Sequence, residues 1–394
     1  MLEPAAARDK VASLIELARR SGADAADAVY VGERSQGVTV RLGALEDVHR
    51  SEGEEIGLRV FRGKKSASVA SSDLSKDALA AEDAARAVKG VTNSNGGSAS
   101  ASASTFAVAT SHGFSGATRA TGYSCSASVV AGEGASMQRD YGWHSARHLA
   151  DLEAADEIGT RAATRAVDRV NPTRVRPGVM PILFDPRVAT TLLGHFVGAI
   201  SGSSIARKSS FLLDALGTQV FAEGVTIHDD PLRKRGLRSR AFDGEGLPVR
   251  PMELVSNGIL NGWLAESASA RQLGIAPTGH AVRGVSGSPG AGPSNLYLAP
   301  GPKAREEMIA GIGNGILVTE LIGQGVNGVT GDYSRGAAGF LIVDGQLGPA
   351  VAEITIASNL KQMFATLEPA SDLRFRRGVD CPTLLVPEMT VASS

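Results

Sequence analysis

Two periodicities of hydrophobic positions run along the chain and predict where helices and strands form. Near the N-terminus, apolar residues recur at the spacing of one helix face, which predicts a helix near residues 7 to 20. A second helix is expected around residues 75 to 88. Between them, alternating runs predict strands, and the turn at 62–65 with its return through 66–71 has the pattern of a hairpin. The predicted strands are Ala28 to Val31, Gly37 to Leu42, Glu46 to Arg50 and Glu55 to Phe61.

The stretch from Asn93 to Ser104 consists almost entirely of Ser, Ala, Gly and Asn, the composition of a flexible linker. Its alternation continues into Phe106 and Val108, and a second alternating run follows after residue 116. A linker has no need to keep a strict period of two, so a strand of small residues is the favoured interpretation. In that arrangement Cys125 of the second run points inward.

A helix at about residues 151–168 and a strand from Met180 to Phe184 precede the most clearly marked helix of the chain. Asp185 followed by Pro186 is a strong start signal, because Asp caps the first turn and Pro tolerates the first helical position. The buried stripe of this helix is expected to be Val188, Leu192 and Phe196.

Three glycines, Gly194, Gly198 and Gly202, recur every four residues on another face of this helix. A line without side chains would let a second backbone approach closely, whereas the simpler interpretation is that glycine frays the helix. The sequence leaves both open.

From about Glu223 onward the pattern is that of strands with long connections, with a mobile loop at 284–293 and a helix from Glu306 to Gly315. The chain has 47 glycines among 394 residues, without a fixed period, which favours tight turns and sheet. We therefore predict an α+β fold. An N-terminal α/β-sheet domain at 1–175 is followed by a larger, glycine-rich, mainly antiparallel β domain at 176–394.

Charge and apolar content exclude several classes of protein. Lys and Arg total 40 against 41 Asp and Glu, so the net charge of -1 predicts no nucleic-acid partner. The apolar runs fall short of the roughly 20 residues that a membrane span requires, and the N-terminus has helical periodicity rather than an apolar leader. Two cysteines are too few for a disulfide framework. A cytoplasmic protein is expected.

His144 and His148 would share one face of a helix, as two metal ligands require, but no Glu follows the first His. Structural or surface histidines are the favoured interpretation.

Residues Gly323 to Gly328 spell G-x-G-x-x-G, yet the residues after them make a poor helix start, so turns explain these glycines better than a nucleotide does. No nucleophile elbow singles out a serine for a catalytic triad.

A dense polar cluster follows these glycines, and it admits two interpretations. It could line a cleft in which Arg335 holds a peptide carboxylate through two hydrogen bonds, or it could be a turn stapled by its own side chains. The cluster consists of Asp332, Tyr333, Ser334 and Arg335.

The segment from Phe184 to Ala199, together with the runs Val318 to Gly323 and Gly331 to Ala337, resembles the TldD/PmbA family of peptidases. In that family the catalytic member carries a His-Glu-x-x-x-His zinc helix after a Leu-Leu pair, and its pairing partner, of the TldE or PmbA type, does not. The resemblance covers nearly the whole chain.

Laying the motif on Leu192-Leu193, with Arg207 as a second anchor, puts Gly194 and Ala199 at the two His positions and His195 at the Glu position. Neither Gly nor Ala has a side chain with a lone pair for a metal. The resemblance therefore implies a degenerate metal helix, with no catalytic residue and no cofactor in this chain.

By the same resemblance, a TldD-type subunit supplies the zinc, and this chain forms one wall of an enclosed cleft for unfolded or modified peptides. The candidate cleft residues are Arg207 and the cluster 332–335. Cys381 lies directly before Pro382-Thr383-Leu384, whereas the family's cysteine ligand lies well upstream of that stretch, so Cys381 is expected to be an ordinary thiol. Relative to the family, some tens of residues are missing between Ala81 and Glu82, either because this region is naturally shorter or because a flexible segment is omitted from the sequence.

Two other classes remain possible from the sequence. The chain could be a hydrolase alone or as a homodimer, through His144 and His148 or an unrecognised site. It could also be a peptide-binding scaffold without a catalytic partner.

Overall fold

The computed structural model describes residues 1–20, 25–42, 44–61 and 78–393. The chain divides into two compact units, and each is discontinuous in sequence. The first comprises Met1–Val167, Lys234–Val249 and Gly279–Gly290, and the second comprises Asp168–Arg233, Arg250–Thr278 and Ala291–Ser394. The first unit thus includes two segments from far along the chain. The domain boundary near residue 175 stays a prediction.

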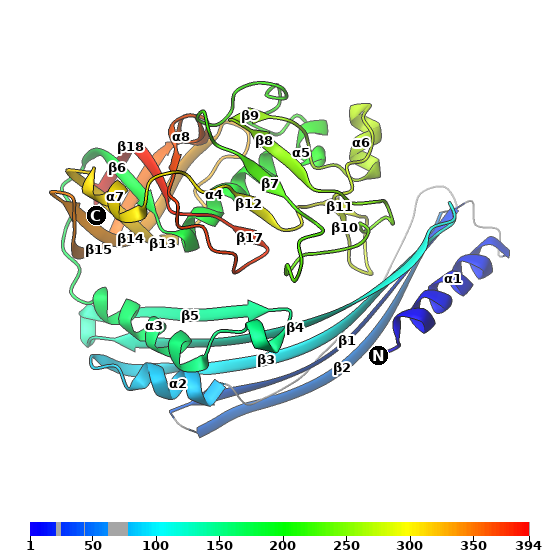
Figure 1. Cartoon of the computed structure of the whole chain (residues 1–394), viewed down its shortest axis with the longest axis horizontal. Helices are drawn as coiled ribbons and strands as arrows, with labels where there is room; N and C mark the ends of the chain where they lie inside the picture. The colour runs from blue at the N-terminus through cyan, green and yellow to red at the C-terminus, as the bar shows by residue number, and fades with distance from the viewer. Residues whose placement is uncertain (21–24, 43, 62–77, 394) are drawn as a thin grey trace. The chain divides into compact units, whose positions relative to one another are not determined.

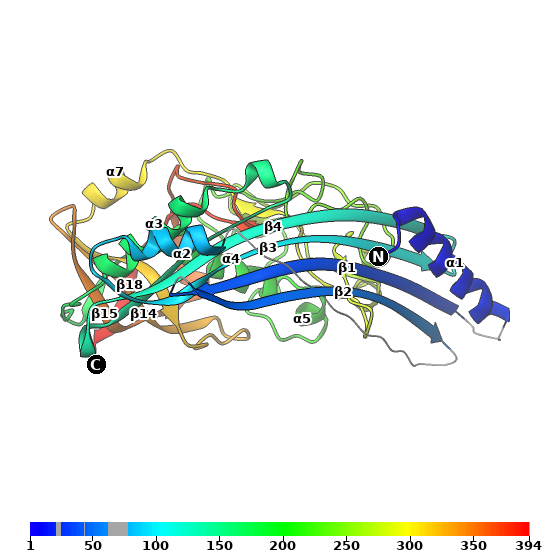
Figure 2. The same ribbon diagram turned by 90° about the horizontal axis from the view of Figure 1, so that it is seen from below.

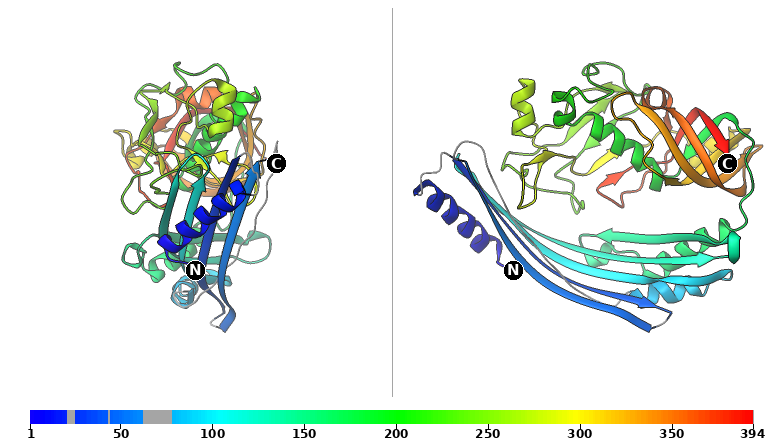
Figure 3. Two further views of the ribbon diagram at one scale, coloured as in Figure 1. Left: turned by 90° about the vertical axis from the view of Figure 1, so that its right-hand side faces the viewer. Right: turned by 180° about the vertical axis from the view of Figure 1, so that it is seen from behind.

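The first unit is built on an antiparallel sheet in the order β2-β1-β3-β4-β5 (Figure 1). Its long strands curve along their length (Figure 3). The helices of this unit are α1 (Pro4–Arg20), α2 (Ala78–Arg86) and α3 (Ala155–Asp168), with short 3₁₀ turns η1 (Gly134–Ser136) and η2 (Leu149–Asp151). Its strands are β1 (Ala25–Arg41), β2 (Ala44–Phe61), β3 (Val91–Thr110), β4 (Ser115–Ala131), β5 (Gln138–Ala146) and β10 (Ala281–Val282). The two-residue strand β11 (Gly290–Ala291) pairs with β10 and has its second residue in the other unit.

The sheet confirms the strand interpretation of the Ser- and Ala-rich stretch, which lies within β3 between β1 and β4. Cys125 is buried, as predicted. The prediction of four short strands before it was wrong in one respect, because they join in pairs into β1 and β2, each running without a break through its glycines. The hairpin predicted at 62–71 lies outside the described residues.

Helices α1, α2 and α3 all pack on one face of this sheet, with α1 at one end and the other two at the opposite end (Figure 2). The predicted apolar stripe of α1 is buried against alternate residues of β1 and β3. This packing explains why the helix forms. The contacting residues are Ala7, Val11, Ile15 and Ala18 from α1 and Ala28, Tyr30, Ala107 and Ala109 from the strands.

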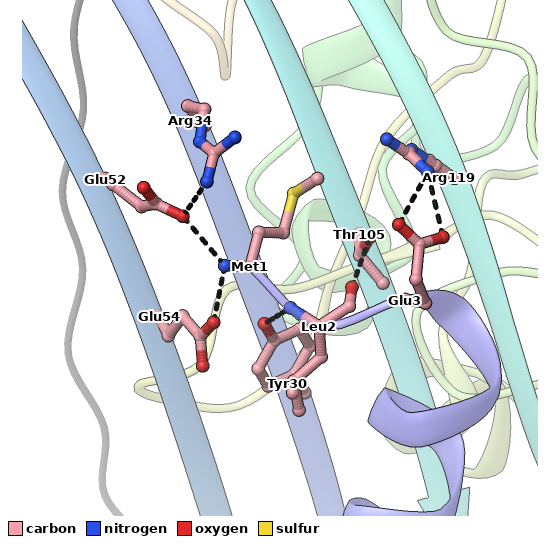
Figure 4. A network of polar contacts seen from close by, with 9 residues as sticks. All are labelled: Met1, Leu2, Glu3, Tyr30, Arg34, Glu52, Glu54, Thr105 and Arg119. Carbon is pink, nitrogen blue, oxygen red and sulfur yellow. Dashed lines mark hydrogen bonds and ion pairs between the residues drawn. The ribbon is translucent and has the colours of Figure 1, made fainter.

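Polar contacts also fix the residues before α1 and at its start to four strands, β1, β2, β3 and β4 (Figure 4). The backbone N–H of Leu2 donates to the Tyr30 hydroxyl at 2.7 Å, and Thr105 Oγ1 donates to the Leu2 carbonyl at 3.2 Å. Arg119 of β4 donates two hydrogen bonds to the Glu3 carboxylate, at 3.0 and 2.9 Å. Tyr30 and Thr105 are buried, whereas Arg119 and Glu3 are largely exposed, so the Arg119–Glu3 ion pair orients α1 more than it stabilises the fold. The Met1 amino group also pairs with Glu52 and Glu54.

In the second unit, β15, β14, β13, β6 and β18 pair in turn, and β15 also pairs with β18, so these strands close into a ring. A separate sheet has the order β17-β12-β7-β8-β9. The strands are β6 (Gly178–Phe184), β7 (Ile227–Asp229), β8 (Met252–Ser256), β9 (Ile259–Leu260), β12 (Leu296–Leu298), β13 (Asn314–Ile322), β14 (Asp332–Val343), β15 (Gln346–Asn359), β16 (Glu368–Pro369), β17 (Val379–Asp380) and β18 (Leu384–Ser393).

The helices of the second unit are α4 (Pro186–Ala199), α5 (Gly202–Ala206), α6 (Ser267–Leu273), α7 (Arg305–Ala310) and α8 (Leu360–Thr366). Helix α7 is shorter than predicted because it ends at Gly311 and the chain enters β13 at Asn314. One large core joins α4 and α8 to both sheets. The α+β class predicted from the sequence is confirmed. Among the described residues, no helix is long and apolar enough to cross a membrane.

Candidate functional site

Helix α4 forms as its sequence predicts. Asp185 is the N-cap, and its carboxylate accepts a hydrogen bond from the backbone N–H of Arg187 at 3.1 Å, while Pro186 occupies the first turn. The predicted stripe of Val188, Leu192 and Phe196 is buried in the core of the second unit. The helix therefore has a fixed rotation, which determines where its polar residues point.

The three residues of α4 that the resemblance aligns with the zinc motif lie in different surroundings. Gly194 is exposed, Ala199 is buried, and His195 is half-buried. The imidazole of His195 meets Tyr333 of β14 edge to face, with ring centroids 6.0 Å apart. Within the described part of the chain, neither His195 Nε2 nor the Tyr333 hydroxyl has a hydrogen-bond partner. These two buried polar atoms are the most conspicuous feature of the region.

Arg335 adds a positive charge beside this pair. Its side chain is only 9% exposed, and Nε donates to the Ile322 carbonyl at 3.2 Å. Burial lowers the pKa of His195, and the charge of Arg335 lowers it further. Burial raises the pKa of Tyr333, so both groups are neutral near pH 7. We call His195, Tyr333 and Arg335 the α4–β14 polar cluster.

The four residues of the predicted cluster 332–335 lie on strand β14, so their side chains do not all point the same way. Successive side chains of β14 point to opposite faces, so Tyr333 and Arg335 are buried while Asp332 and Ser334 are exposed. The Asp332 carboxylate accepts hydrogen bonds from Thr330 Oγ1 and Asn359 Nδ2, which lower its pKa.

Arg207 is exposed at the C-cap of α5 and has no side-chain hydrogen bond or ion pair with the residues that the structure describes. The five candidate cleft residues thus form no single lining, and their role stays a prediction.

The structure resolves the question of the glycine stripe. A Cβ added at Gly194 or Gly198 would have no atom of the described residues within 4 Å, so no described backbone segment packs on α4 along that line. Gly202 does lie in close contact, since a Cβ there would come within 2.9 Å of Ser269 Cβ, but Gly202 belongs to α5. Within the described residues nothing supports close approach at Gly194 or Gly198, and α4 ends at Ala199, before Gly202.

Family models decide the relationship of this chain to known proteins. The model described as the PmbA/TldA metallopeptidase C-terminal domain matches residues 177–393, and the central-domain model matches residues 64–170. The chain belongs to the PmbA/TldD metallopeptidase family. The Metalloprotease PmbA of Escherichia coli O157:H7 is 40% identical over 316 residues, which cover 80% of this chain and 68% of that protein.

A Metalloprotease PmbA homolog of Haemophilus influenzae is 32% identical over 443 residues, covering 98% of this chain and 96% of the relative. The aligned length exceeds the 394 residues of this chain, so this PmbA/TldD relative carries segments that the chain lacks. A shortening between Ala81 and Glu82 stays a prediction.

Solved structures of the same fold include TldE of Thermococcus kodakarensis, with a TM-score of 0.86, 19% identity, and coverage of 97% of this chain and 99% of that one. A candidate modulator of DNA gyrase from Thermotoga maritima has a TM-score of 0.86 at 23% identity, with the same coverage. At these identities the likeness shows the fold alone.

The family name implies a metal, and zinc was expected on the partner, so we tested whether the α4 residues fit one. The side chains of Gly194 and Ala199 offer no lone pair. His195 is the remaining donor, and its neighbour Arg335 is a cation that would repel Zn²⁺. No group of three or more His, Cys, Asp or Glu that could hold a metal occurs among the described residues. The residues present at this position do not fit zinc.

The other sequence motifs take structural roles. His144 lies in β5, not in a helix, and its Nδ1 accepts a hydrogen bond from the Glu153 backbone N–H at 3.0 Å. The two histidines therefore do not share a helix face.

The G-x-G-x-x-G segment is followed by strand β14 rather than by the helix that a nucleotide-binding motif needs, so the interpretation of its glycines as turn residues holds. A Cβ at Gly325 would come within 1.9 Å of the Ser334 carbonyl oxygen, which explains that glycine. Cys381 is buried, and burial raises the pKa of its thiol. It is an unreactive side chain at neutral pH.

The lowered pKa of His195 predicts a pH dependence of stability. The unfolded chain takes up this proton near pH 6.5, whereas the folded chain resists it to lower pH, so the free energy of unfolding falls as pH drops below about 6.5. The variant His195→Gln should lose part of this decline. We would measure urea midpoints at pH 5.5 and 7.5 for both proteins, with exposed His148→Gln as the control. Identical pH dependence in wild type and His195→Gln would refute the assignment.

Proposed function

We propose that this chain is a non-catalytic, TldE/PmbA-type subunit of a two-chain zinc metallopeptidase. A TldD-type partner would supply the zinc, the activating Glu and the bound water. The observation that carries the proposal is the donor set of α4, in which Gly194 and Ala199 stand at the two His positions of the family motif and His195 lies beside Arg335. Water activation and carbonyl polarisation would then take place on the partner.

This chain would form one wall of an enclosed cleft that takes unfolded or modified peptides in the cytoplasm. Three candidate residues have exposed side chains for such contact, Arg207, Asp332 and Ser334. Tyr333 and Arg335 are buried and would act indirectly: the ring of Tyr333 would orient His195, and the charge of Arg335 would keep its imidazole neutral. The near-balanced charge supports peptides over nucleic acid as the substrate.

The proposal is tested by assembly and metal content. Co-expressed with a TldD-type subunit, the chain should elute from size exclusion as a single complex, since an obligate interface buries well above about 2,000 Å² in total. The complex should contain zinc, whereas the isolated chain, as a monomer or homodimer, should contain none in stoichiometric amount. Two separate peaks from the co-expressed pair, or one tightly held zinc per isolated chain, would refute the proposal.

A further inference from the structure

A small cavity lies on the face of the first unit's sheet that is opposite to α1, α2 and α3. Its volume is about 260 Å³. Two neighbouring cross-strand pairs of β3 and β4 form its floor, Ser104 with Ala120 and Phe106 with Thr118. Segments 239–244 and 281–283 and the side chain of Arg147 form its walls. Both segments belong to the same unit as the sheet.

The cavity is lined by more positive than negative charge. Arg147, Arg240 and Arg283 line it together with one carboxylate, Asp243. Arg283 is offset by an ion pair with Asp27 at 2.8 Å. The Asp243 carboxylate is already engaged, because it accepts hydrogen bonds from three backbone N–H groups, those of residues 245, 247 and 281.

Unlike Arg283, whose guanidinium pairs with a carboxylate, Arg147 makes its hydrogen bonds to backbone carbonyls. Its guanidinium donates to three backbone carbonyls, those of Thr121 at 3.2 Å, Gly236 at 3.4 Å and Leu237. These bonds fix the orientation of the side chain but bring no negative charge. Burial lowers the pKa of Arg147, and within the described residues no carboxylate offsets that burial. Two of its five N–H bonds remain for a ligand.

An apolar surface lines the same cavity as this guanidinium. The rings of Phe106 and Phe242 stack with centroids 6.3 Å apart, and Phe114 packs edge to face on Phe242 at 5.0 Å. Phe106 and Phe242 both line the cavity and are only partly buried. A fixed cation together with aromatic rings in a small, concave space is the combination that binds an oxyanion with an apolar body.

We propose that this cavity binds the carboxylate of a small acid with an apolar body, such as the C-terminal residue of a peptide, through Arg147 and the rings of Phe106 and Phe242. The cavity is large enough for a ligand smaller than a typical drug molecule, such as a single amino-acid residue. The identification of the ligand as the end of a peptide rests on the proposed function. The binding of a free acid to the isolated chain does not depend on the proposed function.

The test measures binding by calorimetry to the purified full chain, without any partner. The probes are N-acetylphenylalanine, its C-terminal amide, and inorganic phosphate. We expect the acid to bind at least about tenfold more tightly than the amide, because the charge-assisted hydrogen bonds are lost. Equal affinity for acid and amide would overturn the proposal, and phosphate binding tighter than that of the acid would overturn the carboxylate assignment.

Variants assign the site. Arg147→Ala should weaken acid binding at least about tenfold, while Arg119→Ala, on the other face of β4, should bind as the wild type does. Since Arg147 also holds two carbonyls of segment 234–249, a second pair of variants leaves it in place. Ala120→Glu puts a carboxylate on the cavity floor and should abolish binding of the acid, whereas the neutral Ala120→Gln should retain more of it. Wild-type affinity in folded Ala120→Glu would refute the site.

Discussion

Peptide hydrolysis is expected only from the combination of this chain with a TldD-type subunit. The isolated chain should cleave an unfolded peptide no faster than buffer, because its α4 helix offers no zinc ligands at Gly194 and Ala199. Removing zinc from the pair with a chelator should lower the rate about a thousandfold or more, since the metal contributes several kcal/mol to the transition state. The measurement is a fluorogenic peptide assay on each chain alone and on the pair. Zinc-dependent cleavage by this chain alone would contradict the proposed function.

Rebuilding the motif should not restore activity to the isolated chain. The triple variant Gly194→His, His195→Glu and Ala199→His spells the zinc helix, but Ala199 is buried at 4% exposure and Arg335 stays beside position 195. No second shell would orient the new imidazoles. Weak zinc binding and no hydrolysis are therefore expected. Robust cleavage would show that only the ligands had been lost.

Two glycine-to-alanine substitutions should change stability in opposite directions. Gly159 of α3 lies against the backbone of α2, where an added Cβ would come within 2.0 Å of the Ala81 carbonyl oxygen. Backbone atoms cannot rotate away, so Gly159→Ala should force the helices apart and cost about 1 to 3 kcal/mol, or more. Gly194 of α4 faces open space, so Gly194→Ala should gain about 0.5 to 1 kcal/mol by its better helix propensity.

Denaturant unfolding of both variants checks this pair of predictions. Each change acts on the unit that contains it, so the midpoint of that unit's transition is the quantity to compare. A drop for Gly159→Ala together with a rise for Gly194→Ala is expected. If Gly159→Ala were neutral, the contact between α2 and α3 would not be as close as the structure has it.

The packing of α2 on α3 through Gly159 had no signal in the sequence, because glycine in a helix is usually a sign of fraying. The stripe at Gly194 and Gly198 was the more conspicuous pattern, yet no atom of the described residues would lie within 4 Å of a Cβ added at either glycine. Regular spacing alone did not predict close approach, since that depends on what packs opposite.

Residue patterns along the chain are enough to predict the family, the α+β class and many of the helices and strands. Asp185-Pro186 specified where α4 begins, since a cap and a proline act on adjacent residues. Strict alternation specified β3, because the period of a strand is a local property. That Gly194 and Ala199 have no side chain able to bind zinc also follows from the sequence, since it depends only on residue type.

Contacts between residues far apart in the sequence depend on how the strands and helices pack in three dimensions. His195 of α4 contacts Tyr333 of β14 because of the order of the strands around α4 and the register of β14. That register includes an irregularity, since the pairing of β13 with β14 shifts between Val318 and Glu320. The Arg147 cavity draws on three segments that are far apart in sequence and join one unit. Burial of the whole core determines which strands pair and which distant segments join the same unit, so no local pattern of residues encodes either.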